Sequence, residues 1–390
     1  MKKKKNAYKE DTILAHTGLA PDEHFGVIAP PVTRASSIIQ SSFDAYQKGE
    51  GEFRYGRTGT PLTDKFETAM AELENGYAAV ATPSGMTAIV TSLLTVLKPG
   101  DHVLITDSMY ESARFFTESY LSRINVDVEY YNPRIGRNIE KLIRKNTAVI
   151  YMESPGSGTF EIQDVPAITA VAKKRGIVTM VDNSWASGLL FKPLDHGANI
   201  SILSATKYIG GHADLMLGAI VADSEKTYRQ IKSMAVNFGV CAGSEGLFVG
   251  LRGLRTLKVR MKQCAANALK IAQWLEKRPE VERVYYPALP SSPDHKLWKR
   301  DFTGANGLFS FLLKPASTKS VAAFADALKL FPIASSWGGY ESLLQPQHMK
   351  RLRSAVPWKE KGQLLRLHVG LEDPDDLIAD LAQAFKKFKR

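Results

Sequence analysis

The chain has 390 residues, of which 44% are hydrophobic and 23% are charged, and it contains 29 glycines and 19 prolines. This composition is typical of a folded globular protein, and it excludes a collagen, a low-complexity disordered chain and a coiled-coil rod. At about 150 residues per domain, the length predicts two or three domains. Cys241 and Cys264 are the only cysteines. Two thiols are too few for a disulfide framework or a thiolate zinc site, and they favour a reduced, cytoplasmic setting.

The formal net charge is +11, from 51 Lys and Arg residues against 40 Asp and Glu residues. Much of this excess lies at the two ends of the chain, in Lys2 to Lys5 and in the basic residues of positions 386–390. Basic runs at chain ends are usually solvated tails, so we expect no nucleic-acid partner. The residues after Lys5 are too charged to form the apolar core of a secretion signal, and no export signal is expected.

The first long buried segment runs from Asn75 to Leu97, where no residue is charged. Its length is near that of a membrane-spanning helix, but Pro83 interrupts it and several threonines make it too polar for a lipid bilayer. We therefore expect no membrane partner. The segment instead predicts a short buried strand at 78–81, a turn at 84–86 and a buried helix toward Leu97.

Four short runs rich in β-branched residues follow, at 102–106, 147–152, 176–181 and 199–203. Each run is mostly apolar, without alternation, which is typical of parallel strands that are covered on both faces. Helical segments such as 165–175 lie between the runs, so the pattern predicts an open α/β domain. In such a domain ligands bind at the carboxyl ends of the strands, where we expect the site residues.

The pattern changes after residue 255. A long helical segment at 256–277 is followed by a proline-rich surface connection at 286–293. The remaining elements of this smaller α+β domain are two strands and two helices, predicted at 308–313, 364–369, 320–330 and 374–387. The predicted organisation is an N-terminal arm at 1–60, a large domain at 61–255 and a small C-terminal domain at 256–390.

Two glycine-rich segments come close to nucleotide-binding motifs, and we reject both. The segment 51–58 has the spacing of a P-loop, but Arg57 replaces the lysine and no buried strand precedes it. The segment 156–161 begins like a dinucleotide-binding fingerprint but has Glu161 where the third glycine is required. A nicotinamide-dependent enzyme is therefore not expected.

Lys207 is the most informative residue, because it follows a predicted buried strand among small hydroxyl residues. A lone lysine at a strand end is most often solvated or ion-paired. Ser204 and Thr206, however, offer hydroxyl groups close to it. A lysine that binds pyridoxal phosphate as a Schiff base needs such phosphate donors nearby, so the segment indicates this chemistry.

Asp182 directly follows another buried run, and burying its charge is costly without a cationic partner. It is interpreted either as a cap or turn aspartate or as the partner of a protonated pyridine nitrogen. The turn Ser84-Gly85-Met86 opens a predicted helix, whose first N–H groups suit a phosphate. The alternative for this segment is a tight turn without a ligand.

Tyr110 and Arg366 complete the set of candidates. Tyr110 either provides an aromatic plane that stacks on a cofactor ring or is a core tyrosine. Arg366 is the only arginine in an otherwise apolar strand-like run, and it requires either a substrate carboxylate or a structural ion pair.

Six short motifs occur together along the chain: Y-G-R at 55–57, S-G-M at 84–86, E-S-P at 153–155, D-N at 182–183, S-A-T-K at 204–207 and R-G-L-R-T-L at 252–257. In this order and spacing they resemble the Cys/Met-metabolism family of pyridoxal-phosphate (PLP) enzymes over nearly the whole chain. The resemblance implies the α/β fold type I of PLP-dependent transferases, like that of aspartate aminotransferase. This fold has a large domain with a mainly parallel sheet and a smaller α+β C-terminal domain.

The resemblance also implies roles for individual residues. The catalytic residues would be Lys207, which would carry the cofactor and later remove the Cα proton, and Tyr110, which would stack on the ring. Asp182 would keep the pyridine nitrogen protonated. The other cofactor-binding residues would be Ser84, Gly85, Met86, Ser204 and Thr206, with Tyr55 and Arg57 contributed by the adjacent subunit. The substrate-binding residues would be Ser336, Trp337 and Arg366. The active unit would then be a homo-oligomer, a dimer at minimum and often a tetramer.

Several motifs of the C-terminal half, above all Ser336-Trp337, resemble the bacterial cystathionine β-lyases of this family. The implied reaction is cleavage of L-cystathionine to homocysteine, pyruvate and ammonia in methionine biosynthesis. Two departures are Ser335, where close β-lyases have tyrosine, and Ser184, where they have threonine. One alternative is another family activity, such as a cysteine desulfhydrase, a γ-lyase or a γ-synthase. A different alternative is a non-catalytic PLP-binding or basic nucleic-acid-binding protein.

Overall fold

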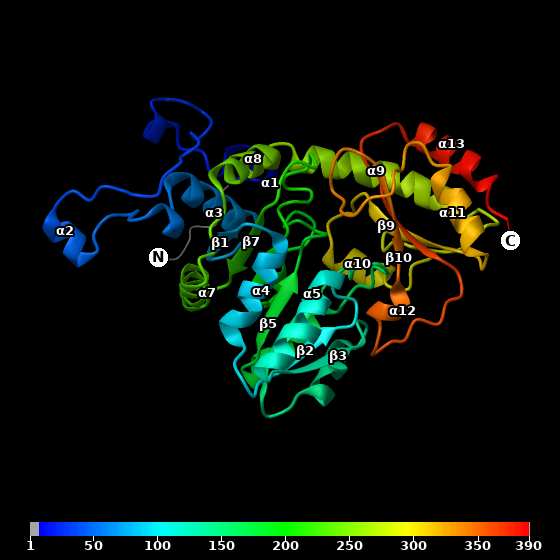
Figure 1. Cartoon of the computed structure of the whole chain (residues 1–390), viewed down its shortest axis with the longest axis horizontal. Helices are drawn as coiled ribbons and strands as arrows, with labels where there is room; N and C mark the ends of the chain where they lie inside the picture. Colours follow the sequence, from blue (N-terminus) through cyan, green and yellow to red (C-terminus); the bar gives the residue numbers. More distant parts are fainter. Residues whose placement is uncertain (1–7, 390) are drawn as a thin grey trace.

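Two β-sheets organise the chain, and the long helix α9 (Leu257–Leu275) leads from the first to the second (Figure 1). The computed structural model describes residues 8–389, so the lysine run at 2–5 and Arg390 lie outside the described residues. No helix within residues 8–389 combines the length and the apolar character that crossing a membrane requires.

The larger sheet has seven strands in the order β1-β7-β6-β5-β4-β2-β3. The strands are β1 (Ala78–Thr82), β2 (His102–Thr106), β3 (Asp127–Tyr131), β4 (Thr147–Glu153), β5 (Val178–Asp182), β6 (Ile200–Leu203) and β7 (Gly218–Ala222). β7 is antiparallel to both of its neighbours, and the other neighbouring pairs are parallel. The predicted strands β1, β2, β4, β5 and β6 are confirmed, and β3 and β7 are additional.

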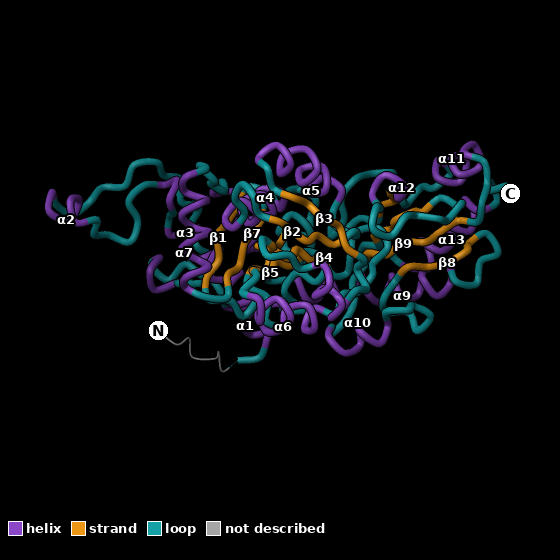
Figure 2. Tube along the Cα trace, turned by 90° about the horizontal axis from the view of Figure 1, so that it is seen from below, coloured by secondary structure: helices purple, strands orange, loops and turns teal. Residues whose placement is uncertain are grey.

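Helices cover both faces of this sheet, with α4 (Gly85–Val96) and α5 (Glu111–Phe116) on one side and α6 (Val165–Arg175) on the other (Figure 2). Consecutive strand residues point to opposite faces. Leu104 of β2 therefore belongs to one buried hydrophobic cluster, while Val103 and Ile105 belong to another. This burial on both faces explains why the strand sequences do not alternate between apolar and polar residues. The other helices of this region are α3 (Pro61–Leu73), α7 (Glu225–Asn237) and α8 (Ser244–Leu254).

The second sheet is antiparallel, with four strands in the order β10-β11-β9-β8. The strands are β8 (Val281–Tyr285), β9 (Leu308–Leu313), β10 (Leu343–Gln347) and β11 (Leu364–His368). The helices after α9 are α10 (His295–Asp301), α11 (Thr318–Asp326), α12 (Met349–Leu352) and α13 (Pro374–Phe385). The predictions of β9, β11, α9, α11 and α13 are confirmed, and β8 and β10 are additional.

The prediction that 286–293 is a surface connection is wrong for two of its residues, which are buried. Tyr286 and Leu289 are buried, at 1% and 0% exposure. Tyr286 packs its ring at 5.3 Å from that of Phe309 and donates its hydroxyl to Asn306 O at 2.7 Å. The connection therefore contributes to the core of the second sheet.

The N-terminal segment consists of short helices joined by extended chain: α1 (Glu10–His16), η1 (Pro21–His24), α2 (Phe43–Lys48) and η2 (Gly56–Thr58). The part around α2 extends away from the two sheets (Figure 1). This part leaves large apolar side chains exposed, among them Phe25, Ile28, Ile39 and Phe43. In contrast, α1 is fixed by Arg255, which donates to Leu14 O and Thr17 O, both at 2.7 Å. The domain boundaries at residues 60 and 255 stay predictions.

Candidate active site

A cavity of about 410 Å³ opens beyond the carboxyl ends of β4, β5 and β6, and its lining comes from both sheets. The predicted site residues in this lining are Ser84, Gly85, Met86, Tyr110, Asp182, Ser204, Thr206, Lys207, Ser336, Trp337 and Arg366. Tyr55 and Arg57 do not belong to it. The cavity lies where an open α/β sheet is expected to bind its ligand.

Lys207 lies in the turn after β6, and its side chain is partly buried in the cavity wall. It donates a hydrogen bond from Nζ to Ser336 Oγ at 2.6 Å, and Nζ lies 5.4 Å from the centre of the Trp337 ring. Burial, followed by the nearby charge of Arg366, lowers the pKa of Lys207 to about 8. An amine with this pKa has an appreciable neutral fraction near neutral pH, and the neutral amine is the nucleophile that Schiff-base formation requires.

Asp182 is the last residue of β5 and is buried, at 7% exposure. Its Oδ1 accepts a hydrogen bond from Ser184 N at 3.0 Å, and Oδ2 accepts one from the Tyr151 hydroxyl at 3.5 Å. Burial raises the pKa of Asp182, although the hydrogen bonds from Ser184 and the charge of Lys207 oppose this shift. A buried carboxylate that borders a cavity fits a cationic ligand group, such as a protonated pyridine nitrogen.

The turn at 84–86 fits a phosphate. Ser84 caps α4 by accepting a hydrogen bond from Thr87 N at 3.1 Å, and the first residues of the helix border the cavity. Gly85 is required sterically, because a Cβ there would lie 2.6 Å from Ser204 Oγ. The Thr206 hydroxyl is engaged with Leu217, to whose carbonyl it donates at 3.1 Å. Thr206 would therefore have to release this carbonyl before donating to a phosphate.

Tyr110 precedes α5 and borders the cavity, with 43% of its surface exposed. Its backbone N–H donates a hydrogen bond to Glu153 Oε2 at 2.6 Å. The alternative of a core tyrosine is wrong, because such a side chain would be buried. The exposed ring is available to stack on a ligand ring.

Arg366 lies on β11 and is buried, at 9% exposure. Its Nη2 donates to Ser336 O at 3.0 Å and to the amide oxygen of Gln345. No carboxylate within residues 8–389 forms an ion pair with it, so the alternative of a structural ion pair has no partner among these residues. Burial lowers the pKa of Arg366 to about 10. A buried guanidinium without a carboxylate partner is suited to bind the carboxylate of a substrate.

Tyr55 and Arg57 lie away from this cavity. Tyr55 is 46% exposed, and Arg57 donates from Nη1 to Val236 O near the end of α7, at 2.6 Å. Their predicted contact with the cofactor phosphate is therefore not made within one chain. Their contribution to the site of an adjacent subunit stays a prediction.

Glu153 is a cavity residue that the sequence pattern leaves without a role. It ends β4 in register with Asp182 on β5, so two buried carboxylates lie on neighbouring strands. Its Oε1 accepts a hydrogen bond from Ser157 Oγ at 2.5 Å, and its Oε2 holds the Tyr110 backbone. Burial and the charge of Asp182 raise the pKa of Glu153 well above its usual range. A carboxylate at the end of an apolar strand is the signal that could have identified it, as it does for Asp182.

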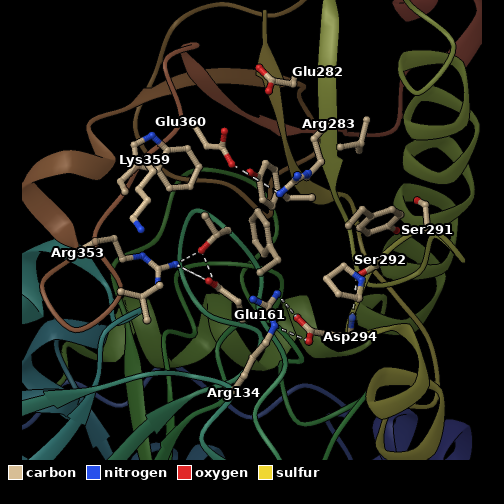
Figure 3. A pocket seen from close by; sticks show the side chains of 18 of the residues that line it. Arg134, Glu161, Glu282, Arg283, Ser291, Ser292, Asp294, Arg353, Lys359 and Glu360 are labelled. Carbon is tan, nitrogen blue, oxygen red and sulfur yellow. Dashed lines mark hydrogen bonds and ion pairs between the residues drawn. The ribbon is translucent and has the colours of Figure 1, made fainter.

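A second cavity, of about 1000 Å³, adjoins the first and shares Phe160 and Arg353 with it (Figure 3). Several of its charged side chains form ion pairs: Arg134 with Asp294 at 2.7 Å, Arg353 with Glu161 at 2.9 Å and Arg283 with Glu360 at 3.8 Å. These charges satisfy one another, so we assign the candidate active site to the cavity around Lys207. In the described part of the chain, no cluster of His, Cys, Asp and Glu side chains could hold a metal ion.

Comparison with known proteins places these observations in a family. The sequence matches the family described as Cys/Met metabolism PLP-dependent enzyme over residues 11–386. The cystathionine beta-lyase MetC of Escherichia coli is 42% identical over 390 residues, covering 97% of this chain and 98% of that protein. The L-alanine/L-glutamate racemase of Wolbachia pipientis is 39% identical over 395 residues, covering 97% of each chain. The structure of cystathionine gamma synthase from Xanthomonas oryzae pv. oryzae, in complex with aminoacrylate and cysteine, has a TM-score of 0.91 at 31% identity, covering 98% of this chain and 99% of that one.

The large, mostly parallel sheet, the smaller antiparallel sheet and the lysine site define an enzyme of the PLP-dependent fold type I. The chain belongs to the Cys/Met metabolism PLP-dependent enzymes. The expected fold class and the expected cofactor, pyridoxal phosphate, are thereby confirmed. The cavity fits this cofactor, because it combines the Lys207 amine, the buried Asp182 carboxylate and a helix start at Gly85.

Proposed function

We propose that the protein is a carbon–sulfur β-lyase that cleaves L-cystathionine to homocysteine, pyruvate and ammonia, a step of methionine biosynthesis. The observation that carries this proposal is that Lys207 and Arg366, from the two different sheet regions, border one cavity and both contact Ser336. An α-amino acid needs such a pair, since its amine must reach the lysine site while its carboxylate is held. The similarity to a cystathionine beta-lyase supports the choice of substrate.

When bound, PLP supplies an electron sink that makes the Cα proton of an amino acid acidic. Arg366 binds the α-carboxylate and so fixes the amino acid relative to Lys207. The Lys207 amine takes the Cα proton at Nζ, while Ser336 Oγ holds Nζ in place. The β-sulfur then leaves as a thiolate, to which the same Nζ can return the proton to give homocysteine. The three-carbon remainder would be released as an enamine, which reacts with water to give pyruvate and ammonia.

The proposal also assigns the residues that hold the cofactor. Asp182 would stabilise a protonated pyridine nitrogen, and Tyr110 would stack on the ring. The phosphate would lie at the start of α4, against Ser84, Gly85, Met86, Ser204 and Thr206. We place the enzyme in the cytoplasm, where its two free cysteines would stay reduced.

A homo-oligomer is part of the same proposal. Tyr55 and Arg57 would reach the phosphate of an adjacent subunit, which requires at least a dimer and allows a tetramer. The exposed apolar side chains of the N-terminal segment, such as Phe25 and Phe43, support an interface there.

A racemase is the second candidate function. A relative named L-alanine/L-glutamate racemase matches 97% of this chain, and racemisation needs the same first step, removal of the Cα proton.

Ser335 lines the cavity with a small hydroxyl side chain. A tyrosine there would fill more of the cavity, so we expect Ser335 to change how the distal end of cystathionine is held.

Product analysis with the purified, PLP-loaded protein tests the proposed function. L-cystathionine is expected to give pyruvate and homocysteine in equal amounts, and Lys207→Ala is expected to give neither. Formation of 2-oxobutyrate and cysteine would instead identify γ-cleavage, and D-alanine formed from L-alanine without any cleavage of cystathionine would identify the racemase. A protein that binds PLP but converts none of these substrates would contradict an enzymatic role.

Visible absorbance of the bound cofactor checks the lysine attachment independently of turnover. The absorbance is expected to be lost or shifted in Lys207→Ala and kept in Lys226→Ala, which removes an exposed lysine of α7. If the two variants had the same spectrum, Lys207 would not be the residue to which the cofactor is attached.

A further inference from the structure

Gln345 and Arg366 are register partners on the neighbouring antiparallel strands β10 and β11. Partners in such a pair point to the same face of the sheet, and both side chains line the cavity around Lys207. The amide oxygen of Gln345 accepts a hydrogen bond from Arg366 Nη2, and Ser336 O accepts another from the same nitrogen at 3.0 Å. Arg366 is therefore held by two acceptors, and neither of them carries a charge.

The two acceptors occupy one nitrogen of the guanidinium. All hydrogen bonds that Arg366 donates within residues 8–389 start from Nη2, so Nη1 and Nε are left for a ligand in the cavity. A carboxylate binds best through two parallel N–H groups. It can use Nη1 alone, or it can replace one of the neutral acceptors at Nη2, which is easier than replacing another carboxylate.

The chemistry of residue 345 therefore decides how much of the Arg366 charge is available. A glutamate has nearly the shape of glutamine, but at this position it would form a buried ion pair with Arg366 and compete with the substrate carboxylate. We propose that Gln345 is a positioning residue, which fixes the Arg366 guanidinium and leaves its charge uncompensated for the substrate carboxylate. This inference rests on the proposed function in one respect, namely that Arg366 binds a carboxylate.

The test compares Gln345→Glu, Gln345→Leu and the wild type by calorimetric binding of 3-(ethylthio)propionate, which has a carboxylate but no amine. Gln345→Glu is expected to weaken this binding at least tenfold. Gln345→Leu keeps the side-chain volume but removes the hydrogen-bond acceptor, and it is expected to weaken the binding at least threefold. Binding of the neutral amide of the same compound is expected to stay unchanged. Gln273→Glu, the same substitution at an exposed position of α9, is the matched control and is expected to bind like the wild type.

Steady-state kinetics provide a second measurement on the PLP-loaded enzyme. In Gln345→Glu the KM for L-cystathionine is expected to rise at least tenfold while kcat falls less than threefold, because competition for Arg366 affects binding first. A purely structural role would instead lower the unfolding temperature and weaken carboxylate and amide alike.

The outcomes separate this inference from the proposed function. The positioning role would be overturned if Gln345→Glu bound the carboxylate with wild-type affinity. If Gln345→Glu does not fold, the same outcome in Gln345→Leu would overturn it. Binding of the carboxylate needs no turnover, so an enzyme that fails to cleave cystathionine would overturn the proposed function and leave the Gln345 result standing.

Discussion

Lys207 and Ser336 are joined by a hydrogen bond of 2.6 Å from Nζ to Oγ, although they lie 129 residues apart in the sequence. Ser336 has a φ of 89°, a conformation that is rare for residues other than glycine. Its carbonyl also accepts a hydrogen bond from Arg366 at 3.0 Å, so one residue contacts both Lys207 and Arg366. Backbone conformations of this kind persist only where surrounding contacts fix them, and they are frequent at functional sites.

Substitutions at Ser336 separate the role of its hydroxyl from that of its backbone. Ser336→Ala and Ser336→Gly both remove the bond to Lys207, so we expect similar decreases in kcat, by about tenfold, the effect of one hydrogen bond to a charged group. Glycine adopts a positive φ without strain, so Ser336→Gly is expected to be more stable than Ser336→Ala by about 1 kcal/mol. Kinetics and urea unfolding measure the two effects. Equal stabilities with unequal kcat values would contradict this division of roles.

Arg366→Ala removes the proposed partner of the substrate α-carboxylate. We expect KM to rise and kcat/KM to fall by about 3 kcal/mol or more, since a buried charge pair is lost in the bound state. Initial rates over a range of cystathionine concentrations measure the effect. Trp337→Phe is the milder comparison, because a phenyl ring still packs beside Lys207. If Arg366→Ala retained wild-type kinetics, Arg366 would have a structural role only.

Glu74 is a fully buried carboxyl group behind the site, and its Oε1 accepts a hydrogen bond from Asn183 Nδ2 at 2.8 Å. Burial raises the pKa of Glu74 to about 7, although the bond from Asn183 and the charge of Lys192 oppose the shift. With an unfolded pKa of 4.5, the folded state binds more protons than the unfolded state between these two values. The contribution of Glu74 to the unfolding free energy is therefore complete below pH 4.5 and is lost as the pH rises through about 7, a change of about 3 kcal/mol.

Glu74→Gln removes this titration and keeps a polar side chain of the same shape. We expect the stability of the wild type relative to this variant to fall between pH 4.5 and about 7, and urea unfolding at several pH values measures the difference. Glu50→Gln, at an exposed position, is the control and is expected to show little pH-dependent difference. A constant difference for Glu74→Gln across this range would mean that Glu74 does not titrate there.

The strand that ends at Asp182 and the strand that precedes Lys207 could be predicted because β5 and β6 are buried on both faces and are mostly apolar. The residues after such strands must lie at the carboxyl edge of the sheet, which is why both side chains were expected in one site. β3 and β10 have weaker signals. β3 is an edge strand with an exposed Asp127, and β10 contains Pro346, a residue that argues against a strand.

The contact between Gln345 and Arg366 could not be predicted in the same way. It depends on the antiparallel register of β10 and β11, which places two residues 21 positions apart directly opposite each other. No local periodicity determines this register, because the intervening chain is irregular apart from the short helix α12. The predicted contact of Tyr55 and Arg57 with the cofactor of an adjacent subunit would require a second chain, so the structure of a single subunit does not test it.

The exposed Arg57 lies on the N-terminal segment, away from the cavity of its own chain. If it binds the cofactor phosphate of a second subunit, Arg57→Ala and Lys207→Ala proteins are each nearly inactive but complement each other. A mixed dimer then has one site with both substitutions and one site with both native residues. Random reassociation of equal amounts makes half of the dimers mixed, so we expect activity to recover to about a quarter of the wild-type value.

The experiment unfolds or dissociates the two proteins together, reassembles them and measures the activity of the mixture. Each variant treated alone controls for incomplete inactivation. A mixture of Lys207→Ala with Asp182→Ala is the matched control, because these two residues border the same cavity of one chain and every mixed site therefore keeps a defect. Recovery in the first mixture alone supports a shared site. An Arg57 mixture that stays as inactive as the Asp182 mixture would contradict it, since Arg57 would then act within its own subunit or not on the cofactor at all.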